Sequence, residues 1–207
     1  MEPLTIVLAT RNKGKLREIR AIYGDLPIVW RSMDDEGDAP VVEETGATFE
    51  ENALLKARAA RDWCRRPAIA EDSGLEVDAL SGAPGVRSAR FAGENASDEA
   101  NNQLLLQRLG NARSGDRTAR FVSVFALVGA DGSEVTAKGA CEGRIADGPR
   151  GSSGFGYDPL FIPRGEDLTF AELGADFKNR VSHRAAALRA LRPLLEERLR
   201  RWETRKQ

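Results

Sequence analysis

Apolar and polar residues near the start of the chain follow the order strand, helix, strand. Leu4–Ala9 is a compact apolar run rich in β-branched residues, and it predicts a buried first strand. After a short turn that contains glycine, Leu16, Ile19 and Tyr23 recur at helical spacing. Ile28–Trp30 predicts a second, short strand. A strand followed by a short turn and a helix is typical of an α/β protein.

Capping residues and a second apolar run extend this pattern. Thr48–Glu51, with the sequence TFEE, matches a capping box and predicts the start of a helix, which Pro67 ends. The apolar residues 68–70 then predict a buried strand. We expect this strand to end at two adjacent carboxylates, Glu71 and Asp72, and to be followed by a turn.

The second half of the chain predicts a helix, a hairpin and a long last helix. Ser97 caps a helix that runs to about Leu109, and Ser182 begins the last helix. Strands at Arg120–Gly129 and Glu134–Glu142 flank an Ala-Asp-Gly turn, as in a β-hairpin. No internal repeat or linker-like segment interrupts the chain. We therefore expect one mixed α/β domain over residues 1–207.

Composition narrows the class of protein. The chain is 41% hydrophobic and 30% charged, which is ordinary for a globular protein. Its 31 basic and 32 acidic residues leave a net charge of −1, so the whole molecule is not built to attract nucleic acid or a membrane. Two cysteines are too few for a disulfide framework, and the first residues lack the pattern of a secretion signal. We expect a cytoplasmic protein that binds neither nucleic acid nor membrane.

Thr10–Lys15, with the sequence TRNKGK, lies where the first strand passes into a helix. Backbone N–H groups at a helix N-terminus, with Lys13 and Lys15 nearby, suit phosphate binding. The segment lacks the GxxxxGK[ST] pattern of a P-loop. An ordinary solvated turn is the alternative interpretation.

Two pairs of adjacent carboxylates are candidates for a magnesium site: Glu43 with Glu44, and Glu71 with Asp72. Mg²⁺ prefers oxygen ligands and is commonly held by one or two carboxylates together with phosphate oxygens. The alternative is that the first pair lies in a solvated loop and Glu71 caps a local turn. Asp72 follows a buried apolar run and precedes Ser-Gly, a context that exposed loops rarely have.

Two further segments suit the recognition of a base. In GSSGFGYDP, residues 151–159, Phe155 is placed to stack on a base, whereas a tight turn with buried rings is the alternative. Lys178, Ser182, His183 and Arg184 gather cationic and polar donors near the start of the last helix. Cations oppose the helix dipole there, so this cluster does not serve helix stability and suits an acceptor-rich ligand.

Five sequence blocks occur together: TRNKGK, EETGATFEENALLKA, AIAEDSGLEVDALSGAPGVRSARFAG, GFGYDP and SHR. Their order and spacing resemble the inosine triphosphate pyrophosphatase family, the Ham1-like enzymes that hydrolyse deoxyinosine and xanthosine triphosphates. The resemblance covers nearly the whole chain. It implies an elongated mixed α/β fold with flanking helices and two lobes around a central cleft. It also implies a homodimer, Mg²⁺ as cofactor, and purine nucleoside triphosphates as substrates that yield the monophosphate and pyrophosphate.

The resemblance assigns a role to individual residues. Asp72 resembles the carboxylate that acts as proton acceptor and metal ligand, and Glu43 resembles a second magnesium ligand. Arg11 stands where many members have glycine, and Glu71 where many have aspartate. The implied substrate-binding residues are Thr10, Arg11, Asn12, Lys13, Gly14 and Lys15 for the triphosphate, Ser73, and Phe155, Gly156, Tyr157, Asp158, Lys178, His183 and Arg184 for the base.

Two other functions are compatible with these residues. The first is a Maf-like nucleotide pyrophosphatase with a different base preference. The second is a nucleotide- or RNA-binding module without catalysis, which would use the basic last helix. The carboxylate pairs argue against the second, because a binder of polyanions has no need of them unless a metal ion intervenes.

Overall fold

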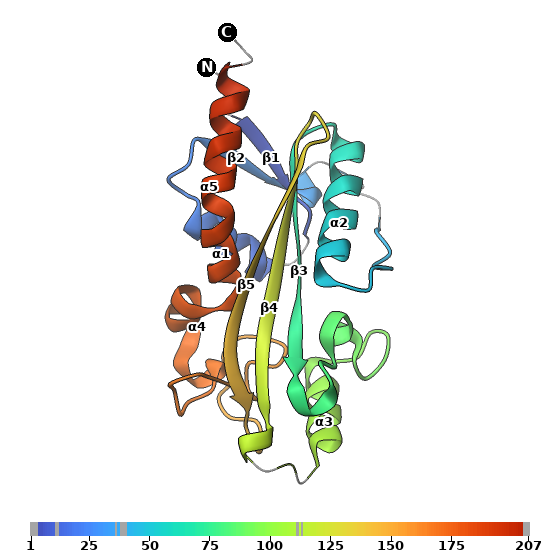
Figure 1. Cartoon of the computed structure of the whole chain (residues 1–207), viewed down its shortest axis with the longest axis vertical. Helices are drawn as coiled ribbons and strands as arrows, with labels where there is room; N and C mark the ends of the chain where they lie inside the picture. The colour runs from blue at the N-terminus through green and yellow to red at the C-terminus, as the bar shows by residue number, and fades with distance from the viewer. Residues whose placement is uncertain are drawn as a thin grey trace. The chain divides into compact units, whose positions relative to one another are not determined.

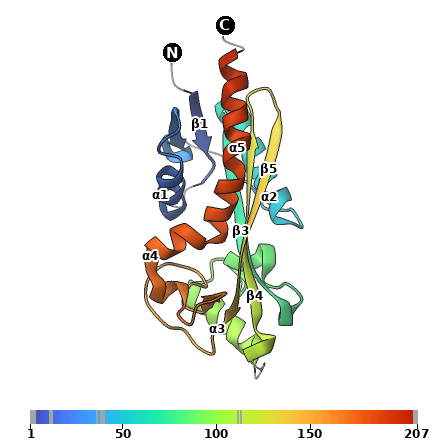
Figure 2. The same cartoon turned by 60° about the vertical axis from the view of Figure 1, so that its left-hand side comes forward.

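The computed structural model describes residues 4–10, 13–35, 37, 41–110, 112 and 114–204. Its strands are β1 (Leu4–Leu8), β2 (Ile28–Ser32), β3 (Ala68–Val77), β4 (Thr118–Val128), β5 (Glu134–Ile145) and β6 (Phe161–Pro163). Its α-helices are α1 (Lys13–Ile22), α2 (Phe49–Cys64), α3 (Asp98–Leu109), α4 (Phe170–Val181) and α5 (His183–Thr204), as Figures 1 and 2 show. Short 3₁₀ helices cover Met33–Asp35, Asp78–Leu80, Gly85–Arg90 and Ser114–Asp116.

The strands form one mixed sheet in the order β2-β1-β3-β4-β5-β6. β1 pairs in parallel with β2 and with β3, whereas β5 and β6 are antiparallel. β4 and β5 are joined by the expected tight turn, in which Gly129 N–H donates to the Ser133 carbonyl at 2.8 Å. The prediction of an α/β fold with a mixed sheet and flanking helices is therefore confirmed.

Two compact units divide the chain. The first comprises Met1–Asp72, Val124–Gly139 and Ala187–Gln207, and the second comprises Ser73–Ser123 and Ala140–Ala186. β3, β4, β5 and α5 contribute residues to both units. Each unit has its own hydrophobic cluster, so each is described separately. The single domain and the central cleft expected from the sequence stay predictions.

In the first unit, helices cover both faces of the strands (Figures 1 and 2). Ile6 on β1 and Ile69 on β3 pack in one cluster with Ile19 of α1 and Leu188 of α5. The Tyr23 hydroxyl is buried there and donates to the Leu188 carbonyl at 2.7 Å. α2 lies on the opposite face, where its small buried alanines permit close packing: Ala53, Ala57 and Ala60.

In the second unit, α3 and α4 pack against one face of β3, β4 and β5. The cluster contains Leu105 of α3, Phe121 of β4 and Phe170 of α4. The ring centroids of Phe121 and Phe161 lie 4.6 Å apart. Because side chains alternate between the faces of a strand, the residues between these core positions point to the other face.

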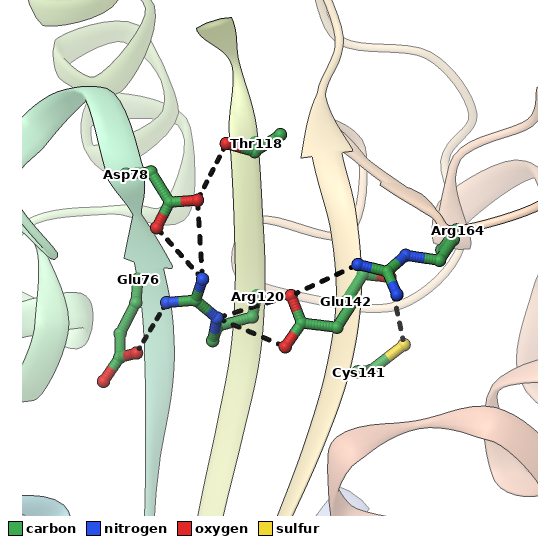
Figure 3. Close-up of polar contacts among 7 residues, drawn as sticks. All are labelled: Glu76, Asp78, Thr118, Arg120, Cys141, Glu142 and Arg164. Carbon is green, nitrogen blue, oxygen red and sulfur yellow. Dashed lines mark hydrogen bonds and ion pairs between the residues drawn. The ribbon is translucent and has the colours of Figure 1, made fainter. Parts of the chain in front are cut away.

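That other face carries a charged cluster around Arg120, shown in Figure 3. The Arg120 guanidinium contacts Asp78 at 3.0 Å, Glu142 at 3.2 Å and Glu76 at 3.5 Å. The three carboxylates come from β3 or its end and from β5, on either side of β4. Arg120 therefore balances negative charges that lie on both sides of β4.

Several predicted boundaries are confirmed. Thr48 forms the expected capping box with Glu51, and its Oγ1 accepts from the Glu51 N–H at 3.2 Å. Ser97 caps α3, and α5 begins directly after Ser182, whose Oγ accepts from the Ala185 N–H. Within the described residues, no helix has the length and apolar character that crossing a membrane requires.

Two features differ from the prediction. β3 does not end at Glu71 and Asp72 but continues through them to Val77, because both carboxylates meet lysines inside the fold and need not leave the sheet. Helix α4 was not predicted. Its start carries a second capping box, Thr169 with Glu172, although Gly174 with a φ of +80° interrupts the helix and weakens the periodic pattern.

Candidate active site

Lys56 brings two carboxylates of the first unit together. It extends from α2, and its Nζ lies 2.8 Å from Asp72 Oδ1 and 2.9 Å from Glu44 Oε1. Asp72 is only 7% exposed. A buried carboxylate is unfavourable unless a cation or hydrogen-bond donors compensate its charge, and Lys56 supplies that compensation.

Asn52 supports the same carboxylate from one turn earlier on α2. Its Nδ2 donates to Asp72 Oδ2 at 3.3 Å, and its Oδ1 accepts from the Gly46 N–H at 2.8 Å. Residues four apart lie on one face of a helix, so Asn52 and Lys56 reach Asp72 together. A Cβ at Gly46 would lie 2.6 Å from Asn52 Oδ1, so only glycine allows this approach.

Glu71 meets a different lysine. Its Oε2 lies 3.1 Å from Lys15 Nζ, and both side chains are largely buried. Neighbouring residues of a strand point to opposite faces of the sheet. Glu71 therefore faces the side covered by α1, and Asp72 faces the side covered by α2. The adjacent carboxylates are separated by the sheet, and each is paired with its own lysine.

The electrostatic state of Asp72 follows from these contacts. Burial raises the pKa of Asp72, the charge and hydrogen bond of Lys56 lower it, and Glu44 adds to the increase; the net direction is upward. For Lys56, burial lowers the pKa, but Asp72 and Glu44 outweigh it and the net pKa is raised. Asp72 is therefore a more basic carboxylate than one in water, beside a lysine that remains protonated.

The second unit holds the residues expected to recognise the base. The Phe155 ring is 41% exposed, whereas Tyr157 is buried and its hydroxyl donates to the Ser88 carbonyl at 2.8 Å. Of the two rings in this loop, Phe155 thus has the surface available for stacking on a ligand. A Cβ at Gly154, where φ is +87°, would lie 2.2 Å from Asp158 Oδ2, so glycine is required there.

Two cations lie beside the Phe155 ring. Lys178 Nζ is 4.3 Å from the ring centroid and Arg184 Cζ is 5.9 Å from it, both within the range of a cation–π contact. Arg184 is 2% exposed. His183 is also buried, and its ring stacks on Phe121 with centroids 4.8 Å apart. These donors are held in fixed positions by the core of the second unit.

The Asp158 carboxylate is buried, and it holds neighbouring groups in place. It is 1% exposed, and its Oδ2 accepts from Lys178 Nζ at 2.5 Å and from the Phe155 N–H at 3.0 Å. Burial raises its pKa, although Lys178 opposes this. Asp158 thereby fixes both the lysine and the backbone next to Phe155.

The first unit offers a place for a cation. Glu44 and Asp72 direct oxygens to one point, which the Lys56 ammonium occupies. Oxygen donors of this kind fit Mg²⁺. Among the described residues, no three His, Cys, Asp or Glu side chains gather closely enough to hold a metal ion by themselves. Mg²⁺ bound with one or two carboxylates takes its other ligands from water and substrate phosphates.

The structure places most of the predicted phosphate- and metal-binding residues on or near β1, α1 and β3. Asp72, Glu71 and Lys15 are paired as described. Thr10 lies two residues after the end of β1, and Ser73 follows Asp72 on β3. Lys13 and Gly14 begin α1, while Arg11 and Asn12 lie outside the described residues. Glu43, the predicted metal ligand, has an exposed side chain, and it is its neighbour Glu44 that shares Lys56 with Asp72.

Lys56 and Asn52 were missed by sequence reasoning. The signal was present: both lie on the helix that the Thr48 capping box starts, four residues apart and interleaved with buried alanines. Polar residues on the buried face of a helix point to a partner inside the fold.

Comparison with known families identifies this architecture. The model of the Ham1 family matches residues 6–194. The chain belongs to the Ham1 family. The predicted family resemblance is thereby confirmed, and the site of this Ham1 protein can be considered beside its relatives.

Two curated relatives are named dITP/XTP pyrophosphatase. The protein from Geobacter sulfurreducens is 54% identical over 187 residues, which cover 90% of this chain and 94% of the relative. The protein from Streptomyces coelicolor is 47% identical over 194 residues, covering 93% and 97%.

Solved structures have the same fold. The Ham1 protein of Staphylococcus aureus is 45% identical with a TM-score of 0.86, covering 94% of this chain and 99% of that one. A structure from Mycobacterium abscessus, named nucleoside-triphosphatase / dITP/XTP pyrophosphatase, is 45% identical with a TM-score of 0.77, covering 93% and 100%.

Replacing Lys56 by methionine in this Ham1 protein is expected to raise the pKa of Asp72 further, because burial remains while the compensating charge is lost. The measurement is a pH titration of the Asp72 carboxyl ¹³C signal by NMR. Between its ordinary and raised pKa the folded protein binds more protons than the unfolded chain, so stability falls as pH rises through that range. The range is expected to widen in Lys56→Met.

Lys178→Met is the matched control. It removes the lysine paired with the other buried aspartate and is expected to raise the pKa of Asp158 while leaving that of Asp72 in place. If the pKa of Asp72 is the same in wild type and Lys56→Met, Lys56 does not compensate the charge of Asp72.

Proposed function

We propose that this chain is a nucleoside-triphosphate pyrophosphatase. It hydrolyses dITP, ITP, XTP and dXTP to the nucleoside monophosphate and pyrophosphate, and so removes non-standard purines from the nucleotide pool. Relatives with 54% and 47% identity over nine tenths of the chain carry the name dITP/XTP pyrophosphatase, which supports this activity. The observation that carries the chemistry is the buried Asp72 carboxylate, which shares one lysine ammonium with Glu44.

Residues of the first unit bind the triphosphate. Lys56, beside Asp72, is a largely buried cation that can pair with a phosphate oxygen. Lys15, beside Glu71 on the other side of the sheet, is the second cation assigned to the phosphates. The N-terminus of α1 begins at Lys13 and adds backbone N–H donors. These contacts orient the phosphates and stabilise the charge that moves onto the pyrophosphate as it leaves.

Asp72 and Glu44 hold Mg²⁺ in this proposal, with Glu43 as the further ligand predicted from the sequence. Their converging oxygens support the assignment. When bound, Mg²⁺ neutralises negative charge on the phosphate oxygens. Bound Mg²⁺ would compensate the charges of Asp72 and Glu44, and the Lys56 ammonium, which pairs with both here, could then turn to a phosphate oxygen.

Asp72 accepts the proton of the attacking water. In the metal-free protein, burial raises the pKa of Asp72 while Lys56 opposes that rise. A carboxylate within reach of the attacking water can act as its general base. The water oxygen forms a bond to the α-phosphorus, and the bond from that phosphorus to the bridging oxygen breaks. The electron pair leaves with pyrophosphate, and the water proton passes to Asp72. Ser73, the next residue on β3, contacts the substrate in this arrangement.

Residues of the second unit select the base. The exposed Phe155 ring provides a stacking surface, and Gly156 and Tyr157 shape the same loop. Lys178, His183 and Arg184 offer donors to the carbonyl at position 6 of hypoxanthine or xanthine. Adenine presents an amino donor there, which would leave these donors unpaired, and such mismatches discriminate strongly. Asp158 acts through Lys178, which it fixes.

The cytoplasmic location and the homodimer expected from the sequence belong to this proposal as well. The two free cysteines support a reducing compartment. The family resemblance supports the dimer.

A substrate panel tests the function. Purified protein is incubated with dITP, XTP, dGTP, dATP and ITP, with Mg²⁺ or with a chelator, and pyrophosphate is measured against orthophosphate. We expect pyrophosphate from dITP, ITP and XTP only when Mg²⁺ is present. Asp72→Asn is expected to be about a thousandfold slower on all of them. Orthophosphate as the main product, or no turnover of any triphosphate, would falsify the proposal.

Arg184→Ala is expected to narrow the preference for ITP over ATP by about tenfold, because a charged donor to the 6-carbonyl is lost. The ratio of kcat/KM for the two substrates measures this. Arg189→Ala, at an exposed position further along α5, is the control and should leave the ratio unchanged. An unaltered ratio in Arg184→Ala at a temperature where the variant is folded counts against a role in reading the base.

A further inference from the structure

Helix α3 holds the Phe155 loop through both backbone groups of one glycine. Asp98 lies in the first turn of α3, and its Oδ2 accepts from the Gly156 N–H at 2.6 Å. Asn102, one turn further along, donates from Nδ2 to the Gly156 carbonyl oxygen at 3.0 Å. Because residues four apart share a helix face, both contacts come from one side of α3.

These contacts fix the backbone on either side of Phe155. Asp158 accepts from the Phe155 N–H, and Asp98 accepts from the N–H of the peptide that follows Phe155. Gly156 has a φ of +62°, a left-handed conformation that glycine adopts readily because it has no Cβ. The direction of the Phe155 ring is thus set by Asp158 from within the loop and by Asp98 and Asn102 from α3.

The Phe155 ring depends on this backbone. At 41% exposure it is not enclosed by a core that would fix its position. Yet it lies within cation–π range of both Lys178 and Arg184. If the backbone moved, the ring would leave the two cations, and the surface expected to stack on a base would change shape.

Asn102 is an unusual residue for its position. It is 8% exposed, and its Oδ1 is buried without a hydrogen-bond partner among the described residues. An unpaired buried acceptor lowers stability, so a leucine of similar shape would suit the fold better. Flipping the amide would turn Oδ1 toward the Gly156 carbonyl and lose the bond. The asparagine is therefore explained by its donor to Gly156 and not by packing.

We infer that Asp98 and Asn102 are positioning residues for base selectivity. They do not touch the substrate; they hold Gly156, and through it the Phe155 ring, in register with Lys178 and Arg184. This inference rests on the proposed function, because it concerns how the base is recognised. It assigns to α3 a part in selectivity that the five sequence blocks and the predicted site residues do not include.

The consequence is a separation of base binding from phosphate binding. Loosening Gly156 disturbs the residues that face the base, while Asp72, Lys56 and Glu44 keep their mutual contacts. The variants should therefore raise KM for dITP and reduce the preference for dITP over dATP, with a smaller change in kcat. Inhibition by inorganic tripolyphosphate, which has no base, should stay the same.

The test uses Asn102→Leu and Asp98→Ala in the full chain. Each is expected to raise KM for dITP by about five- to tenfold, because one of the two hydrogen bonds that hold Gly156 is lost. The dITP-to-dATP preference should fall by a similar factor. Asn102→Leu removes one hydrogen bond and one unpaired buried acceptor together, so its stability in urea denaturation should stay close to that of the wild type. Asp98→Asn keeps an acceptor oxygen and should recover most of the lost selectivity.

Asn101→Leu is the matched control. Asn101 is the neighbouring buried asparagine of α3, but its side chain accepts from the Ala92 N–H and donates to the Ala89 carbonyl. Its replacement breaks two satisfied bonds, so it should lower stability and leave the dITP-to-dATP preference unchanged at a temperature where the protein is folded.

The inference is overturned if Asn102→Leu and Asp98→Ala retain the wild-type KM and selectivity. It is also overturned if their affinity for tripolyphosphate falls as much as that for dITP, since that would mean a general structural loss. A wild-type protein that does not release pyrophosphate from dITP is a different result, which rejects the proposed function itself.

Discussion

The ion pair between Lys56 and Asp72 is the interaction on which the candidate site depends. A carboxylate that is 7% exposed inside a sheet is tolerable only with a cation close by. Glu44 contacts the same ammonium, so two carboxylates already surround one positive charge. In the proposed function, a metal ion would replace the ammonium between the same two carboxylates, with no new side chains required.

The second unit contains a buried aspartate–lysine pair of its own, Asp158 with Lys178, and the comparison shows how context decides the role. The Asp158 side chain also accepts from a backbone N–H of the Phe155 loop, so the pair fixes a loop and a donor. The lysine of Asp72 instead contacts a further carboxylate. The same chemical pair thus holds a loop in one unit, where α3 also contacts the loop, and marks the proposed cation site in the other.

The sequence predicted much of the fold because its signals are local. The Thr48 capping box, the hairpin turn and the apolar runs depend on neighbouring residues, and Thr48, Ser97 and Ser182 all start helices as expected. The site was harder to predict because its contacts are tertiary. That Glu71 and Asp72 remain within a strand follows from lysines on two different helices, and the choice between Glu43 and Glu44 depends on which side chain meets Lys56. Asp98 and Asn102 act on a loop more than fifty residues away.

The central claim is that Asp72, and not Asp158, is the aspartate that binds the metal–nucleotide complex. Its most direct test follows the ¹³C carboxyl signals of both aspartates while Mn²⁺ is added in the presence of a non-hydrolysable α,β-methylene analogue of dITP. The account predicts that the Asp72 signal broadens at a lower Mn²⁺ concentration than the Asp158 signal. Broadening of Asp158 before Asp72, or no effect on Asp72 at saturating Mn²⁺ and analogue, would contradict it.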